Sequence, residues 1–147
     1  MSDTEHFSYA ISLRIQHPAI DPAEITRELR MQPTGSWAAG SQRRTPAGTL
    51  LEGMRSETYW YVRLLAPSQE ATPQPFLERA MAEIVARLGA FKDFFGRVNM
   101  EGGRIVIAIG AYGVHSYGFE FSPSLHQQIG ALGAAVLVEV FRDPQNW

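Results

Sequence analysis

The stretch FSYAISLRIQ, from Phe7 to Gln16, decides the fold because its apolar side chains recur at every second position. A period of two is typical of a β-strand that buries one face and leaves the other open. The predicted buried row is Phe7, Tyr9, Ile11, Leu13 and Ile15, and the predicted open row is Ser8, Ala10, Ser12, Arg14 and Gln16. Such a strand needs other strands beside it and helices over its apolar face.

Three later stretches have helical character and can supply that covering layer. The first begins with Asp21 as N-cap and Pro22 at the first helical position. The second, Phe76–Leu88, has an apolar stripe at the helical period, and the following residues 90–95 are expected to add one turn. The third covers residues 122–133, with a serine cap, a proline and a terminal glycine. We therefore expect two short helices and one longer helix.

Four further strands are predicted, at residues 56–65, 104–113, 117–121 and 134–141. The glycine-containing turn at 113–116 is expected to form a hairpin between the second and third of these. Residues 66–75 are expected to be a polar connector. An alternating strand followed by a proline-started helix occurs twice, which indicates a weak internal strand–helix–strand duplication. The predicted fold class is α+β, ferredoxin-like, with a mainly antiparallel sheet and helices on one face.

Composition limits the class of protein. The chain has 147 residues, 45% of them hydrophobic and 19% charged, which predicts a single domain over 1–147 with an ordered core at about 7–142. A net charge of -2 gives no reason to expect nucleic acid or anionic lipid as a partner. We expect no membrane span and no signal peptide, and hence a cytoplasmic protein. The absence of cysteine excludes a disulfide framework and a thiolate metal site.

The segment from Gly35 to Trp60, GSWAAGSQRRTPAGTLLEGMRSETYW, is the predicted functional region because it is long, aromatic and basic. Arginine guanidinium groups recognise carboxylates and phosphates, and tryptophan offers a flat wall or stacks with arginine. The predicted binding residues are Trp37, Arg43, Arg44, Arg55 and Trp60. The structural alternative is that Trp37 and Trp60 fill the core while the arginines pair with Glu52 and Glu57.

Other residue patterns give little support for catalysis. The histidines His6, His17, His115 and His126 form no zinc motif, and no nucleotide-binding loop or nucleophile elbow is present. We therefore expect no catalytic residue, no metal and no cofactor. If the protein is an enzyme, a cleft would have to bring polar groups together from different parts of the chain, such as Arg43, His115 and Glu120. The terminal Trp147 is expected to dock on its own domain or a second subunit, or to lie in a disordered end.

Four stretches together resemble one bacterial family: ISLRIQHPAIDPAEIT, PTGSWAAGSQRRTPAGTLLEG, the pair Tyr59-Trp60, and SLHQQIGALGAAVLVEVF. The chain is similar over about Phe7–Phe141 to the family called domain of unknown function 4279. The most specific part is Ser36-Trp37 with Gly40, Arg43, Thr45-Pro46 and Gly48. The resemblance implies a small bacterial single-domain protein and brings no activity, cofactor or catalytic residue.

The residues and the resemblance together favour a non-enzymatic binding or protein-interaction module, with a protein partner or self-association. An alternative is a protein, or an enzyme, that binds a small anionic ligand in a pocket lined by the 35–60 segment. A further alternative is an inhibitor of the toxin-immunity type.

Overall fold

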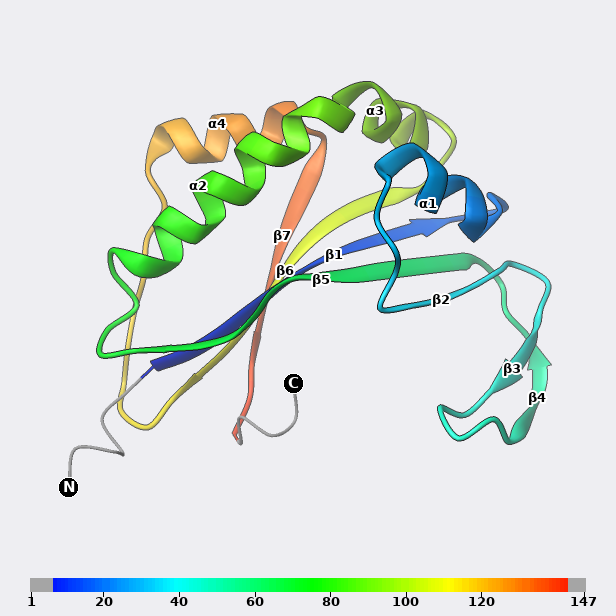
Figure 1. Cartoon of the computed structure of the whole chain (residues 1–147), viewed down its shortest axis with the longest axis horizontal. Helices are drawn as coiled ribbons and strands as arrows, with labels where there is room; N and C mark the ends of the chain where they lie inside the picture. The colour runs from blue at the N-terminus through cyan, green and yellow to red at the C-terminus, as the bar shows by residue number, and fades with distance from the viewer. Residues whose placement is uncertain (1–6, 143–147) are drawn as a thin grey trace.

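The computed structural model describes residues 7–142. Its strands are β1 (Phe7–His17), β2 (Gly35–Trp37), β3 (Gln42–Arg44), β4 (Leu50–Met54), β5 (Thr58–Glu70), β6 (Arg104–Gly113) and β7 (Ala134–Val140). Its helices are α1 (Pro22–Leu29), α2 (Phe76–Leu88), the 3-10 turn η2 (Gly89–Phe91), α3 (Lys92–Met100) and α4 (Pro123–Ala131). All four α-helices lie on one side of a curved sheet, and the other side carries none of them (Figure 1).

The main sheet has five strands in the order β2-β5-β1-β6-β7. β1 is central and pairs antiparallel with both β5 and β6, and β2 pairs antiparallel with β5. β6 and β7 are parallel, with α4 between them in the chain. A parallel pair needs a crossover connection of this kind. A second sheet is the antiparallel hairpin of β3 and β4.

The core lies between the sheet and the helices, as the alternation in β1 predicts. Every member of the predicted buried row of β1 is at most 4% exposed. The helices add apolar side chains that pack onto this row: Ile25, Leu29, Leu77, Met81, Val85, Leu88, Phe95, Val98, Leu125 and Ile129. The two proline-started helices have the predicted caps, since Asp21 and Ser122 each accept a backbone N–H of the first turn.

The predicted α+β class, the mainly antiparallel sheet and the helices on one face are confirmed. Helix α2 and strand β6 have the predicted bounds. The element order departs from the ferredoxin-like β-α-β-β-α-β, because α2 and α3 separate β5 from β6. The two halves are also not equivalent, since β1 is antiparallel to β5 whereas β6 is parallel to β7. The predicted internal duplication is therefore limited to the two helix starts.

The predicted strand at 117–121, and the hairpin before it, are wrong. β6 is already paired with β1 on one edge and β7 on the other, so no edge remains for a third partner. The alternation nevertheless has a structural cause, because Tyr117, Phe119 and Phe121 pack against the core. The backbone is held instead by side chains of the α2 region: Glu120 N–H donates to Gln74 Oε1 at 3.0 Å and Ser122 N–H to Glu78 Oε2 at 2.5 Å.

Three other boundaries differ from prediction. β5 extends into the predicted polar connector as far as Glu70, and Pro67 is tolerated there because only residues 59–61 of β5 pair with β2. The predicted single turn at 90–95 is instead η2 followed by the nine-residue helix α3. The 35–60 segment contains three short strands where an irregular excursion is predicted.

The prediction for Trp147 lies outside the described residues. No helix within 7–142 is both long and apolar enough to cross a bilayer.

Candidate functional site

The candidate site lies on the helix-free face of the sheet, where alternate residues of β1, β2 and β5 come together. The pairing register places Trp37 beside Tyr59, and Tyr61 beside both Gly35 and Arg14. Ser12 stands opposite Arg63 in the next row. We call this region the aromatic–arginine surface, and it consists of Trp37, Tyr59, Tyr61, Arg14, Arg55 and Arg63.

Its aromatic part is a row of three rings. The Trp37 and Tyr59 rings are stacked with centroids 4.7 Å apart, and the Tyr59 and Tyr61 centroids are 5.6 Å apart. Gly35 makes room for the third ring, because a Cβ at that position would lie 2.6 Å from Cε1 of Tyr61. Stacked aromatic pairs add stabilisation beyond the area that they bury. The row is therefore a preformed, half-exposed apolar platform.

Arg55 joins this platform to the β3–β4 hairpin. Its guanidinium carbon lies 3.9 Å from the centroid of the Trp37 ring, a cation–π geometry. Its Nη2 donates to the backbone carbonyl of Arg44 at 3.1 Å. The backbone closes the same junction, since Gly40 N–H donates to the Arg55 carbonyl and Arg55 N–H to the Ser41 carbonyl. The hairpin is thus clamped at its base.

At the other end of the row, Arg14 donates to Glu139 of β7 at 2.6 Å. The two side chains are partly buried and reach across β6. Burial raises the pKa of the Tyr59 phenol, with Glu139 and Tyr61 raising it further and Arg14 opposing them. Tyr59 therefore stays uncharged in neutral solution. A small hollow of about 50 Å³ lies here, with Arg14, Arg63, Glu139 and Phe141 among its lining residues.

The hairpin arm, which we define as residues 40–55, extends from the β2 edge away from the body of the molecule (Figure 1). Its strands carry exposed apolar side chains, Leu50 at 52% and Met54 at 63% exposure. Arg43 and Arg44 are exposed as well, and neither forms an ion pair with any residue in 7–142. Arg43 only donates to the backbone carbonyl of Glu52, at 3.3 Å.

The predicted binding residues are thus divided by the structure. Trp37, Arg55 and the Arg44 backbone are in contact, and Arg43 lies on the same hairpin. Trp60 is on the opposite face of β5, fully buried, and its Nε1–H donates to Thr26 Oγ1 at 3.1 Å. Trp60 therefore belongs to the core and cannot form a wall of the same site. The suggested pairing of Arg43 and Arg44 with Glu52 and Glu57 carboxylates is not formed either; the Glu57 carboxylate accepts from Gln16.

The suggested trio Arg43, His115 and Glu120 does not converge. Arg43 is on the hairpin, whereas residues 114–121 lie at the opposite end of the sheet (Figure 1). A hollow in the hairpin arm is lined by residues of β3 and β4, with no arginine. In the part of the chain that the structure describes, no group of three or more His, Asp or Glu side chains is placed to hold a metal ion.

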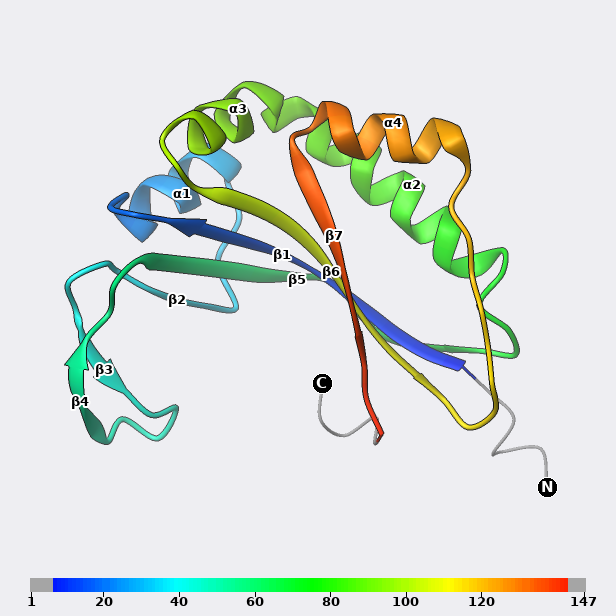
Figure 2. The ribbon, with the colours of Figure 1, turned by 180° about the vertical axis from the view of Figure 1, so that it is seen from behind.

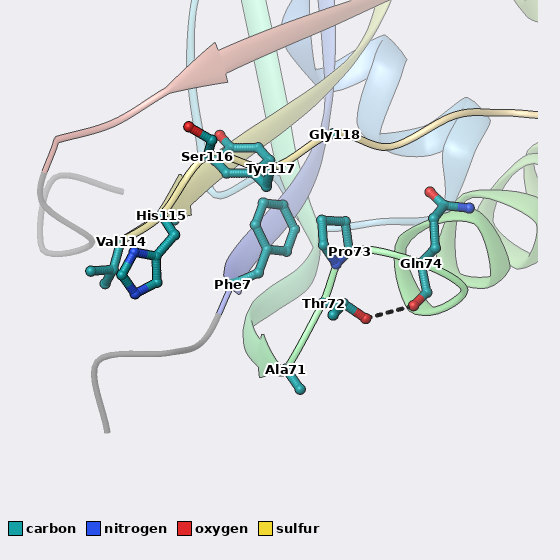
Figure 3. A pocket seen from close by; sticks show the side chains of 11 residues that line it. Phe7, Ala71, Thr72, Pro73, Gln74, Val114, His115, Ser116, Tyr117 and Gly118 are labelled. Carbon is teal, nitrogen blue, oxygen red and sulfur yellow. Dashed lines mark hydrogen bonds between the residues drawn. The ribbon is translucent and has the colours of Figure 1, made fainter. Parts of the chain in front are cut away.

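A second, separate hollow of about 550 Å³ lies at the end of the core where β5 leads into α2. Figure 3 shows Phe7 at its centre, Tyr117 above it, Pro73 and Thr72 on one side, and Val114 with His115 on the other. The lining is mainly apolar, and the Phe7 and Tyr117 ring centroids are 4.7 Å apart. The buried hydroxyl of Tyr117 has no hydrogen-bond partner among the described residues.

The predicted binding residues do not include Tyr59, Tyr61, Arg14 or Arg63. The signal was present, because Arg14 is in the predicted open row of β1. Along β5, the same parity separates Tyr59, Tyr61 and Arg63 from buried Trp60. Trp60 was predicted as a binding residue because it is a tryptophan, whereas its position in the alternation of β5 places it on the buried face.

Comparison with known proteins gives one result at the family level. Curated proteins and solved structures give no match. A family model described as Domain of unknown function (DUF4279) matches residues 6–140, which include all the strands, all the helices and the aromatic–arginine surface described above. The chain therefore belongs to the DUF4279 family.

Proposed function

We propose that the protein is a non-enzymatic interaction module that binds an acidic protein partner through the aromatic–arginine surface and the hairpin arm. The observation that carries this proposal is the row of adjacent rings Trp37–Tyr59–Tyr61, flanked by Arg14, Arg55 and Arg63 on the helix-free face. Tryptophan, tyrosine and arginine are the residue types that dominate binding energy at protein interfaces. Here they are contiguous and partly exposed.

Charge supports an acidic partner. The chain as a whole carries -2, yet the surface and the arm together present Arg14, Arg43, Arg44, Arg55 and Arg63. Of these five arginines, only Arg14 is ion-paired with a carboxylate in residues 7–142. Guanidinium groups that lack a carboxylate partner within the described residues favour a binding partner with carboxylates and speed its association. The exposed Leu50 and Met54 add apolar contact area beside these charges.

Preorganisation is the second support. The rings of the platform are already in contact, and Arg55 is already fixed between Trp37 and the Arg44 carbonyl. Side chains that are ordered before binding lose less conformational entropy on association. The surface therefore resembles a rigid interface more than a mobile loop.

Site-specific photocrosslinking tests the proposal. A photoreactive residue replaces Leu50 in the arm or, as the control position, Met100 of α3, which is 89% exposed. In a lysate of cells that carry the gene, we expect the position 50 probe, and not the position 100 probe, to form an adduct with an acidic protein. Raising the salt concentration should lower the yield of this adduct, because salt screens the attraction between the two proteins.

Charge reversal then tests whether the arginines of the aromatic–arginine surface and the hairpin arm are needed for the adduct. Arg44→Glu with Arg63→Glu should reduce the adduct about tenfold or more, since rim charges govern association. Neither guanidinium forms an ion pair with a carboxylate in residues 7–142, so the fold should persist. Arg79→Glu with Arg87→Glu, two exposed positions on α2, is the matched control and should leave the adduct unchanged. Equal adduct yields from both double variants would overturn the proposal.

The identity of the captured partner tests the further alternative. If the partner were a toxin, the protein would be an inhibitor of the toxin-immunity type.

A small-molecule function is the second candidate, and the hollow beside Phe7 and Tyr117 favours it. Its volume of about 550 Å³ is in the range of ligand sites, and its lining is mainly apolar. This location replaces the expected pocket in the 35–60 segment. A thermal-shift panel of aromatic and carboxylic compounds tests it, because a ligand at 100 times its Kd adds about 2.7 kcal/mol of stability. Val114→Trp, which narrows the hollow, should abolish any such shift.

A further inference from the structure

β7 is an edge strand whose outer side pairs with no strand in the described residues 7–142. It is the last strand of the sheet order, and its pairing runs from Ala134 to Val140 along β6 only. Three of its aliphatic side chains are notably exposed: Leu137 at 39%, Val138 at 41% and Val140 at 68%. Within residues 7–142, no other strand pairs with this edge.

Soluble proteins usually protect such an edge with lysine, proline, a bulge or a very short strand. The opposite edge of this sheet is protected, since β2 has only three residues and the uncovered part of β5 contains Pro67 and register irregularities. β7 has seven residues in continuous register and neither lysine, arginine nor proline. Its one charge, Glu139, is paired with Arg14. Nothing on β7 opposes the approach of another strand.

We propose that β7 pairs antiparallel with β7 of a second copy of the chain, about a two-fold axis at Leu137. In this register Leu137 faces Leu137 of the second copy, Val136 faces Val138, and Ala134 faces Val140. These pairs join aliphatic side chains on the same face of the sheet, which is the favourable arrangement for cross-strand neighbours. Glu139 faces Ala135 and keeps its Arg14 partner.

The second copy is the occupant because the strand is complementary to itself. A closed two-fold interface requires that one surface match its own copy, and a nearly neutral aliphatic strand satisfies this without opposing charges. The two sheets then join into one, with the helices of both copies on the same face. The hairpin arm does not obstruct this contact, since it follows β2 at the far edge of the sheet (Figure 2).

Disulfide trapping tests the register, and the lack of native cysteines makes each introduced thiol unique. Leu137→Cys places two thiols on the axis, where directly opposed Cα atoms are about 4.5–5.5 Å apart, within reach of a disulfide. Ala135→Cys puts the two thiols about 14 Å apart, since each lies two residues from the axis. Under mild oxidation we expect a covalent dimer from Leu137→Cys and not from Ala135→Cys. Met100→Cys on α3 is the exposed control.

Sedimentation of the unmodified protein gives an independent measurement. We expect a dimer that becomes a monomer in Val140→Lys, a change at a 68% exposed position that leaves the far-UV circular dichroism unaltered. A monomeric wild-type protein at all concentrations would overturn the proposal. So would cysteine dimers that form equally well at positions 100, 135 and 137, since they would reflect random collision.

Discussion

The buried His17 shows how one side chain fixes a connection. Its Nδ1 accepts backbone N–H groups of Ala19 and Ile20, at 3.0 and 2.8 Å, while its Nε2 lies 2.8 Å from the Glu101 carboxylate. Because Nδ1 is an acceptor, the Nε2–H donates to Glu101. The imidazole thus ends β1, shapes the entry to α1 and ties both to the end of α3.

We expect His17→Ala to destabilise the fold by roughly 2 kcal/mol, because two inward backbone donors lose their acceptor. Urea denaturation measures the change. The control is His115→Ala, an exposed position, which should alter the free energy of unfolding by less than about 0.5 kcal/mol. Equal stabilities of the two variants would contradict the role given to His17.

Glu101 makes this contact pH-dependent. The hydrogen bond from His17 lowers the pKa of Glu101 from its ordinary value of 4.5, and Arg97 lowers it further. A carboxylate with a depressed folded-state pKa contributes stability above the unfolded pKa and loses it as the pH falls through the folded pKa. Glu101→Gln should therefore be less stable than wild type at pH 7.

The stability difference between wild type and Glu101→Gln should shrink as the pH falls below about 4.5 and the wild-type carboxylate gains its proton. Urea midpoints measured on both proteins at neutral and acidic pH test this. A difference that stayed constant over that range would show that the substitution acts by a mechanism other than loss of the charge.

At the scale of the element, the hairpin arm depends on its base. The β3–β4 pair is short and has an irregular register, and an isolated two-stranded hairpin is marginally stable in water. The contacts of Arg55 with Trp37 and with the Arg44 carbonyl compensate for this. The order of the arm therefore depends on these contacts at its junction with the main sheet.

Arg55→Gln removes the cation–π contact, worth about 1 kcal/mol, and so should raise amide exchange in residues 40–55 about fivefold. Arg43→Gln is the matched control, because that side chain makes only a 3.3 Å bond to the Glu52 carbonyl. Hydrogen exchange read by mass spectrometry distinguishes the two. Unchanged protection in Arg55→Gln would mean that the backbone bonds alone hold the arm.

Elements with a strong local signal could be predicted from the sequence. The apolar stripe of Phe76–Leu88 and the aliphatic run at Arg104–Gly113 each gave correct bounds. Residues 117–121 show the limit, because alternation of Tyr117, Phe119 and Phe121 describes which side is buried and not whether a pairing edge is free. The strands of the hairpin arm were not predicted, because their sequence has little alternation. Their order depends on the contact between Arg55 and the ring of Trp37, which lies outside the arm.

At the scale of the whole molecule, the two faces of the sheet have different roles. The helix-covered face forms the core that stabilises the fold, and the helix-free face carries the proposed binding surface. Trp60 and Trp37 illustrate the division, because they belong to neighbouring strands but opposite faces. Trp60→Ala should cost about 3–5 kcal/mol of stability, the usual loss for a large buried aromatic. Trp37→Ala should leave most stability intact and reduce the crosslinked adduct about thirtyfold, as loss of a 2 kcal/mol hot spot would.

Thermal denaturation and crosslinking of both tryptophan variants check this division. Comparable losses of stability in Trp37→Ala and Trp60→Ala would mean that the open face also supports the core. The sequence predicted the open face but not the order of the strands across it, because strand order depends on which sheet edges are left for the last elements to pair with. Here the α4 crossover returns the chain beside β6 and places Glu139 within reach of Arg14.

The separation of the two tryptophans has an optical consequence. Trp60 is sealed from solvent, whereas Trp37 is half-buried under a guanidinium at the edge of the open face. With Trp147 replaced by phenylalanine, all tryptophan fluorescence would come from these two indoles. A dissolved quencher would reach Trp37 first, and a bound ligand would shield it, while the emission of Trp60 would change only on unfolding. The protein thus contains one reporter of occupancy and one of folding, without an added dye.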